Sequence, residues 1–158
     1  MAADVREVHV LVQDAERGSA QWWRERTGAG PSDVAVQDLP PSPRHGVVWT
    51  ARHWATDRAR DLGAPPEQLQ DIALLTSELV GNAVVHGGGG QVEVRFGAVD
   101  RLITIAVSDF GGGLPQVRDT DLAVPGGLGL RLVAQIASGW GHHARRGGGK
   151  TVWFSIRT

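Results

Sequence analysis

The sequence predicts an α+β domain, a two-layer sandwich in which helices pack on one face of a mixed β-sheet. A helical stretch from about Glu67 to His86 places Leu, Ile and Ala at intervals of three and four. Two strand-like segments follow it directly, Gln91–Phe96 and Leu102–Val107. The last segments, Trp140–Arg145 and Thr151–Arg157, have the pattern of a closing hairpin. Helices followed by paired strands are typical of this class.

The elements before the first pair of strands are marked by proline and glycine. Val34–Leu39 is a candidate strand, and the prolines that follow it are incompatible with a regular helix or sheet. A second helix is predicted from about Arg44 to Gly63, because its apolar residues recur at three and four. Pro65 and Pro66 then begin the long helix, since proline is tolerated in a first turn.

The stretch Asp109–Gly129 is rich in glycine and proline and has no strong period. A loop of this length in a small domain is usually a lid or a binding loop. A short helix, Leu130–Ala137, follows it, with Leu130, Val133 and Ala134 on one face. The sequence therefore predicts the order helix, helix, strand, strand, loop, helix, strand, strand.

The chain has 158 residues, which predicts one domain with a substantial core. We divide it into an extension, residues 1–38, and the domain itself, residues 39–158. Val8–Val12 in the extension could form a strand, and Trp22 and Trp23 lie among charged residues. The extension could pack on the domain, bind a partner, or be a lineage-specific tail.

Composition and charge exclude several classes of protein. With 16 basic and 17 acidic residues, the chain lacks the basic excess of a nucleic-acid binder. The absence of cysteine excludes disulfides and thiolate metal sites. No segment has the length of a membrane span or the pattern of a signal peptide. We therefore expect a soluble cytoplasmic protein that binds neither nucleic acid nor membrane directly.

The long helix carries a stripe of polar residues. Glu78, Asn82 and His86 follow one another at intervals of four, so their side chains stack along one side. A carboxylate and an amide among leucines and valines are costly unless something pairs with them. The apolar residues between Leu74 and Val85 cover most of the circumference, which predicts a buried segment. The same spacing also fits a solvent-facing polar seam.

A second motif follows the strand Leu102–Val107. Asp109, Gly111 and Gly113 form the pattern D-x-G-x-G. An aspartate at the end of a strand can accept a hydrogen bond from an amino group of a flat ligand. The glycines let the chain turn sharply beside that ligand. An ordinary Asp-Gly turn is the alternative.

Two further glycine clusters come later in the chain. Gly127, Leu128 and Gly129 lead into the short helix, where unobstructed backbone N–H groups could hold phosphates. The cluster before Thr151 begins the last strand, and Thr151 could place its hydroxyl near Asp109 if the two strands are neighbours. A plain helix start and a plain hairpin turn remain the alternatives.

The order of these motifs resembles the histidine-kinase-like (GHKL) ATPase superfamily, and the resemblance covers about residues 39–158. Glu78-x-x-x-Asn82-Ala83 is similar to its N box, Asp109-x-Gly111-x-Gly113 to its first glycine box, and Gly127-x-Gly129 to its second. The resemblance implies the ATP-binding sandwich called the Bergerat fold. Within the superfamily, the chain is most similar to the bacterial anti-sigma factor serine/threonine kinases of actinobacterial type.

The resemblance also implies roles for these residues. Glu78 would be the catalytic base and Asn82 the Mg²⁺ ligand. Asp109, helped by Thr151, would bind the adenine amino group. The glycines of the two boxes and Leu128 would close over the phosphates of ATP. His86 could contact a phosphate or pack at the helix end.

Several cations are candidates for the γ-phosphate: Arg118, Arg131 and Lys150. Each of the two arginines could equally face solvent. We do not expect a metal at His142 and His143, because adjacent residues of a strand point to opposite faces.

The function implied by the resemblance is a kinase that phosphorylates an anti-sigma factor antagonist of STAS type and sequesters a sigma factor. The chain would act as a homodimer. The alternative is an ATP-binding, partner-switching module of the same fold with little or no kinase activity. The ATP-binding part of a sensor histidine kinase is disfavoured, because a dimerisation helix pair with a phosphoacceptor histidine does not precede residue 39.

Overall fold

The computed structural model describes residues 6–7, 34–39, 44–87, 91–110, 127–145 and 148–158. These residues form three helices and one six-stranded sheet with the strand order β1-β2-β3-β4-β6-β5. The elements are β1 (Arg6–Glu7), β2 (Val34–Leu39), α3 (Arg44–Asp61), α4 (Pro66–His86), β3 (Val92–Val99), β4 (Leu102–Asp109), α5 (Gly127–Ile136), β5 (Gly139–Ala144) and β6 (Lys150–Arg157).

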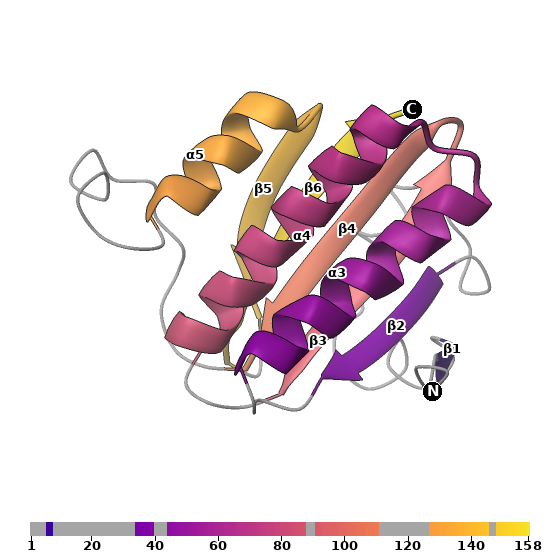
Figure 1. Ribbon diagram of the computed structural model, residues 1–158. Helices are drawn as coiled ribbons and strands as arrows, with labels where there is room; N and C mark the ends of the chain where they lie inside the picture. The colour runs from indigo at the N-terminus through magenta and orange to yellow at the C-terminus, as the bar shows by residue number, and fades with distance from the viewer. Residues whose placement is uncertain (1–5, 8–33, 40–43, 88–90, 111–126, 146–147) are drawn as a thin grey trace.

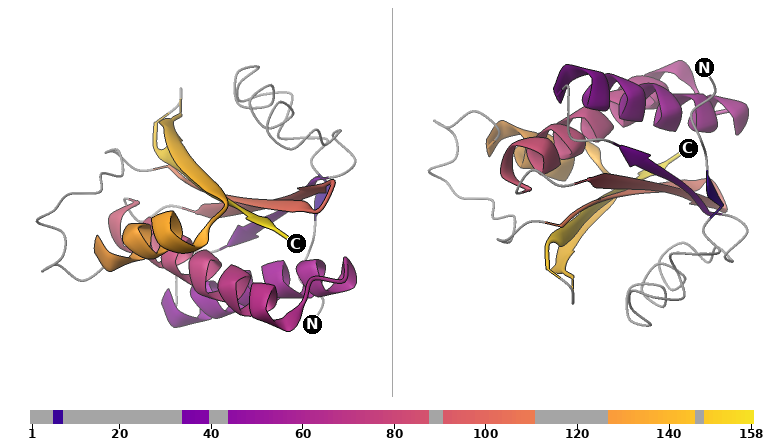
Figure 2. Two further views of the ribbon diagram at one scale, coloured as in Figure 1. Left: turned by 90° about the horizontal axis from the view of Figure 1, so that it is seen from above. Right: turned by 90° about the horizontal axis from the view of Figure 1, so that it is seen from below.

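The three helices cover one face of the sheet, as Figures 1 and 2 show. The predicted α+β class with helices on one face is therefore confirmed. The helices and strands predicted from residue 34 onward all occur, with ends that differ by a few residues. The strand directions differ from the expectation of a mixed sheet, because each of the five described pairings is antiparallel.

The order of the strands explains this arrangement. β3 and β4 form a hairpin, and so do β5 and β6. After β4 the chain crosses by α5 to the edge strand β5, and β6 then returns between β4 and β5. The register of β4 and β6 pairs Asp109 with Lys150 and Ser108 with Thr151. The end of β4 and the start of β6 therefore lie side by side.

The core lies between the helices and the sheet. It includes apolar residues from every described helix and from β3, β4 and β6. Fully buried members are Ile72, Leu75, Val80, Val94, Ile105, Val133 and Phe154. Side chains alternate along each strand, so the helix-facing residues of β4 and β6 are Val107, Asp109, Lys150 and Val152, among others.

Helix α4 is amphipathic, and the prediction of burial around most of its circumference is wrong in part. Ile72, Leu75 and Leu79 are buried, but Leu74 is 39% and Val85 49% exposed. A helix on one face of a two-layer sandwich can bury only the stripe that faces the sheet and its neighbours. The same holds for α5, where Leu130 and Val133 are buried but Ala134 is exposed.

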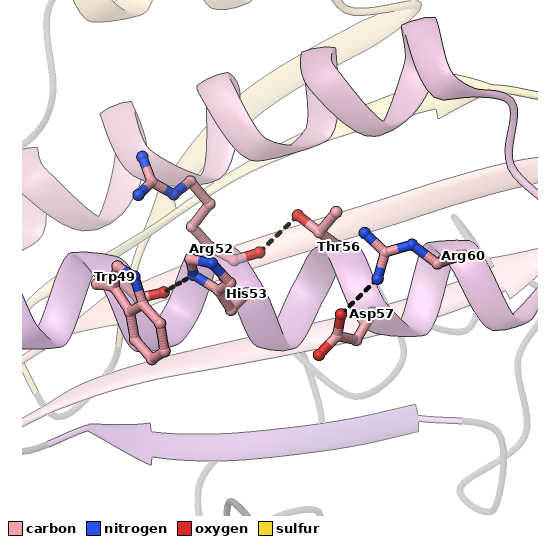
Figure 3. A network of polar contacts seen from close by, with 6 residues as sticks. All are labelled: Trp49, Arg52, His53, Thr56, Asp57 and Arg60. Atoms are coloured by element: carbon pink, nitrogen blue, oxygen red, sulfur yellow. Dashed lines mark hydrogen bonds and ion pairs between the residues drawn. The ribbon is translucent and has the colours of Figure 1, made fainter.

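The outer side of α3 carries polar contacts that remain within the helix (Figure 3). His53 Nδ1 lies 2.8 Å from the carbonyl oxygen of Trp49, and Arg60 and Asp57 form an exposed ion pair. The hydroxyl of Thr56 donates to the carbonyl of Arg52 at 2.6 Å. Because each contact spans three or four residues, this network belongs to the helix and links it to no other element.

The second face of the sheet carries buried polar pairs on β3, β4 and β6. Thr104 and Ser155 share a hydrogen bond of 2.7 Å across β4 and β6, and Ser108 and Thr151 share another of 2.7 Å. Glu93, which is only 1% exposed, is paired with Arg95 at 2.6 Å. These pairs satisfy buried polar groups that would otherwise be costly.

Parts of the prediction lie outside the described residues. These are the candidate strand Val8–Val12, Trp22 and Trp23, Arg118 and the glycines Gly111 and Gly113. Strand β1, at Arg6–Glu7, was not predicted. Among the described helices, none combines the length and the apolar character that crossing a membrane requires.

Candidate functional site

The polar stripe on α4 borders the amino end of α5. Glu78 and Asn82 are half-buried, whereas His86, the last residue of α4, is exposed. A Cβ atom placed on Gly129 would lie 2.6 Å from Glu78 Oε2 and 3.3 Å from Asn82 Nδ2. The predicted acid and amide therefore lie together at the start of α5, so the solvent-facing alternative does not describe them.

The first turn of α5 contains Gly127, Leu128 and Gly129. The first N–H groups of a helix have no partner within it, and the helix dipole favours negative charge there. Because Gly129 has no side chain, the backbone of α5 approaches Glu78 closely. An anion bound at this helix end would lie beside the Glu78 carboxylate. A cation would then be needed to compensate the two negative charges.

The carboxyl end of α4 reaches the end of β4. Gly87 follows His86, and its N–H donates to the carbonyl of Ala83. A Cβ atom at Gly87 would lie 2.8 Å from Asp109 Cβ. Asp109 is therefore packed under the helix end, on the same face of the sheet as the polar stripe. The structure brings the polar stripe of α4 and Asp109 to one end of the sandwich.

Asp109 is buried and forms an ion pair with Lys150. The distance between Asp109 Oδ2 and Lys150 Nζ is 2.8 Å, and the two side chains are 4% and 8% exposed. Lys150 was a candidate for binding the γ-phosphate, but its ammonium group pairs with the Asp109 carboxylate instead. The physical reason is the register, which sets these two residues directly opposite each other on β4 and β6.

Thr151 does not lie where the sequence analysis expected it. Its hydroxyl is 2.7 Å from that of Ser108. Because side chains alternate along a strand, Thr151 is on the far face of the sheet from Asp109, and Lys150 is on the near face. The two strands are neighbours, so the condition for a contact between Thr151 and Asp109 is met, but the register directs the Thr151 side chain to the other face.

The backbone around Asp109 is held by the turn between β5 and β6. Gly149 has φ +85°, and a Cβ atom there would overlap the carbonyl oxygen of Asp109. Phe110, which follows Asp109, is 47% exposed, and the guanidinium of Arg145 lies 4.4 Å from its ring centroid. This geometry is a cation–π contact that links the β5–β6 turn to the residue after the aspartate.

A pocket of about 350 Å³ lies at the other end of the sandwich, where the α3–α4 turn meets the β3–β4 hairpin. Leu62, Ala98 and Arg101 are among the residues that line it, and none of the predicted site residues does. Because β4 runs from Leu102 to Asp109, the two places are separated by the length of that strand.

The residues that are brought together fit a magnesium-bound nucleotide. Asn82 has a side-chain oxygen of the kind that Mg²⁺ prefers, and the Glu78 carboxylate lies beside it because Gly129 lets the start of α5 approach both side chains closely. The amino end of α5 suits phosphate groups. Asp109 supplies a buried acceptor for an amino group.

The pairing of Lys150 with Asp109 was not predicted from the sequence. The available signal was an acid at the end of one predicted strand and a base at the start of another.

Comparison with known proteins identifies the family of this domain. The chain belongs to the family described as the histidine kinase-like ATPase domain, whose family model matches residues 39–156. The match includes every described residue of the site. Comparison with curated proteins gave no match.

The chain is also similar to solved structures of a light-regulated kinase. The blue-light activated histidine kinase of Erythrobacter litoralis EL346 is 27% identical with a TM-score of 0.47, over 59% of this chain and 31% of that chain. The histidine kinase domain from the same protein is 18% identical with a TM-score of 0.47, over 85% of this chain and 67% of that chain. The chain thus spans about a third of the length of the first of these kinases.

Proposed function

We propose that this protein binds Mg-ATP and transfers its γ-phosphoryl group to a serine or threonine of a partner protein. One observation carries the proposal. Glu78 and Asn82 on α4, Gly129 at the start of α5 and Asp109 at the end of β4 lie on one face and at one end of the sandwich. The family to which the chain belongs consists of ATPase domains, which supports a nucleotide as the ligand.

Each residue has a chemical role in this proposal. Asn82 holds Mg²⁺ through its side-chain oxygen, and the bound ion supplies charge neutralisation for the phosphates. Asp109 accepts a hydrogen bond from the adenine amino group. The N–H groups at the start of α5 bind phosphate oxygens. Phosphoryl transfer depends mainly on positioning and electrostatic stabilisation, so this small set of groups is sufficient.

Glu78 acts as the general base. The hydroxyl oxygen of the accepting serine or threonine forms a bond to the γ-phosphorus, and the bond from that phosphorus to the β–γ bridging oxygen breaks. The hydroxyl proton passes to the Glu78 carboxylate. The position of this carboxylate beside the start of α5 supports the assignment.

For the biological role, we propose an anti-sigma factor kinase acting in a reducing cytoplasm. Its substrate would be an anti-sigma factor antagonist of STAS type, its second partner a sigma factor, and its assembly a homodimer. The support is the joint order of the Glu78-x-x-x-Asn82-Ala83 motif and the glycine boxes. A partner-switching module that binds ATP without transferring phosphate is the alternative.

The test compares Glu78→Gln with the wild type. Removing the base should lower phosphorylation of a purified STAS-type antagonist by at least about 100-fold while Mg-ATP still binds, since general bases contribute on this order. Phosphate incorporation and a Mg-ATP titration followed by tryptophan fluorescence measure the two effects.

Glu67→Gln is the matched control, because Glu67 is an exposed acid in the first turn of the same helix. It lies eleven residues earlier, about 16 Å along the helix axis, and should leave transfer unchanged. Equal transfer by Glu78→Gln and wild type would refute the base assignment. Nucleotide binding without transfer by the wild type would favour the partner-switching module.

A further inference from the structure

The buried ion pair between Lys150 and Asp109 is the feature that the proposed roles leave unused. The two side chains meet at 2.8 Å and are almost fully buried. They come from directly opposed positions of β4 and β6, on the side of the sheet that faces α4. Lys150 is therefore a fixed part of the surroundings of Asp109.

The backbone holds Asp109 in place independently of this pair. Gly87 packs against its Cβ atom, and Gly149 packs against its carbonyl group. These contacts fix the Cα and Cβ atoms but leave rotation of the carboxylate group open. The bond to Lys150 Nζ restricts that rotation, because it holds one carboxylate oxygen toward β6.

Charge gives Lys150 a second effect on Asp109. A buried carboxylate without a partner is strongly disfavoured in its ionised form. The ammonium group of Lys150 compensates that charge and so keeps the stronger, charged hydrogen-bond acceptor in place. A carboxylate offers about four acceptor positions, so the bond to Lys150 does not by itself prevent a second donor from binding.

We propose that Lys150 is a positioning residue for nucleobase recognition, which holds the Asp109 carboxylate charged and oriented to accept the 6-amino group of a purine. The inference rests on the proposed function, in which Asp109 contacts adenine. It follows that Lys150 sets the preference for a 6-aminopurine over a purine that lacks the amino group, and does not act on the phosphates.

The experiment measures the binding of three magnesium complexes: ATP, purine riboside triphosphate, which lacks the amino group, and inorganic tripolyphosphate, which lacks the base. The wild type should prefer ATP to purine riboside triphosphate by about tenfold or more, as for a hydrogen bond to a charged group. In Lys150→Met this preference should fall to about threefold or less, while tripolyphosphate binding changes by less than about threefold.

Two further variants separate positioning from folding. Lys150→Arg keeps the charge and should retain most of the preference. Lys150→Gln keeps a donor but removes the charge, so it should lose preference like the methionine variant. If Lys150→Met does not fold, the binding measurements on Lys150→Gln provide the test in its place. Chemical denaturation of each variant shows whether it is folded before binding is measured.

Three results would overturn the inference. The first is an unchanged preference for ATP in folded Lys150→Met or Lys150→Gln. The second is tighter ATP binding by either variant, which would mean that Lys150 competes with the base. The third is an equal loss for all three ligands, which marks a general structural role. A wild type without preference would instead refute the contact between Asp109 and adenine, and this is seen before any variant is made.

Discussion

At the scale of single residues, the site depends on Gly129, which has no side chain and so allows close packing. Gly129 lies against both Glu78 and Asn82, so the first turn of α5 can approach α4 closely. The atom nearest to an added Cβ is Glu78 Oε2, at 2.6 Å, which is the mobile end of its side chain. An added methyl group would therefore displace the carboxylate more readily than it would separate the two helices.

Gly129→Ala should accordingly separate activity from stability. Alanine is favoured over glycine within a helix by about 1 kcal/mol, which offsets part of the local crowding, so the free energy of unfolding should change by no more than about 1 kcal/mol. The displaced Glu78 carboxylate should lower phosphoryl transfer by about tenfold or more, since misplacement by about 1 Å can cost 100-fold. Urea denaturation and a transfer assay measure the two quantities.

Gly81→Ala provides the matched control for this prediction. Gly81 adjoins Asn82 within α4, and a Cβ atom there would meet nothing within 4 Å. The variant should be more stable than the wild type by up to about 1 kcal/mol and fully active. Equal activity losses in the two variants would show that proximity of Gly129 to Glu78 is not the cause.

At the scale of elements, the turn between β5 and β6 contains two glycines near Asp109 that have different surroundings. Both have positive φ, +101° at Gly148 and +85° at Gly149. A Cβ atom at Gly148 would have open space, its nearest neighbour being the Phe110 carbonyl oxygen at 3.9 Å. One at Gly149 would overlap the backbone of Asp109 and lie 2.7 Å from Phe110 Cα. Of these two glycines, therefore, only Gly149 packs tightly on the end of β4.

Alanine at these two positions should have unequal effects. Gly148→Ala adds only the cost of a left-handed backbone, about 1 kcal/mol. Gly149→Ala adds a backbone overlap that must shift Asp109, so it should lower the free energy of unfolding by about 2 kcal/mol or more and weaken Mg-ATP binding. Denaturant titrations of both proteins provide the comparison, and equal losses would contradict the packing described here.

At the scale of the whole molecule, the site joins elements that lie far apart in the sequence. α4, α5, β4 and β6 each contribute to it, and all four also contribute to the hydrophobic core of the described residues. A ligand that contacts all of these elements binds only the folded protein. Its binding therefore stabilises the whole fold by mass action.

Mg-ATP should therefore raise the melting temperature. At 100 times Kd the stabilisation is about 2.7 kcal/mol, or about 5 to 11 °C in Tm for a chain of this length. In Asn82→Ala a tenfold weaker affinity would reduce the shift at the same concentration to about half. Thermal denaturation with Mg-ATP, and with ATP plus excess EDTA, measures both.

The neighbouring variant Gly81→Ala again serves as the control and should retain the full shift. A shift of the same size for Asn82→Ala and the wild type would show that Asn82 does not hold the metal. A wild-type shift that EDTA leaves unchanged would show that nucleotide binding does not depend on Mg²⁺.

The order of the helices and strands, and the choice of Glu78, Asn82 and Asp109 as candidate site residues, followed from local patterns in the sequence. Periodicity placed α4 within one residue of its observed start, and the D-x-G-x-G pattern located Asp109 at the end of a strand. These properties are local, because helical spacing, proline, glycine and strand alternation act over a few residues. The sequence also predicted that Glu78 and Asn82 lie on the same side of the helix, because residues four apart in a helix are neighbours.

Whether Lys150 or Thr151 faces Asp109 depended on the pairing of strands that are distant in the sequence. The register of β4 against β6 places Lys150, and not Thr151, on its side of the sheet, and a shift of one residue exchanges the two faces. The exposure of Leu74 and Val85, the antiparallel directions of the described strands and the approach of Gly129 to Glu78 were likewise settled by packing. The physical reason is that contacts between distant segments depend on the positions of all the elements together, which no local pattern encodes.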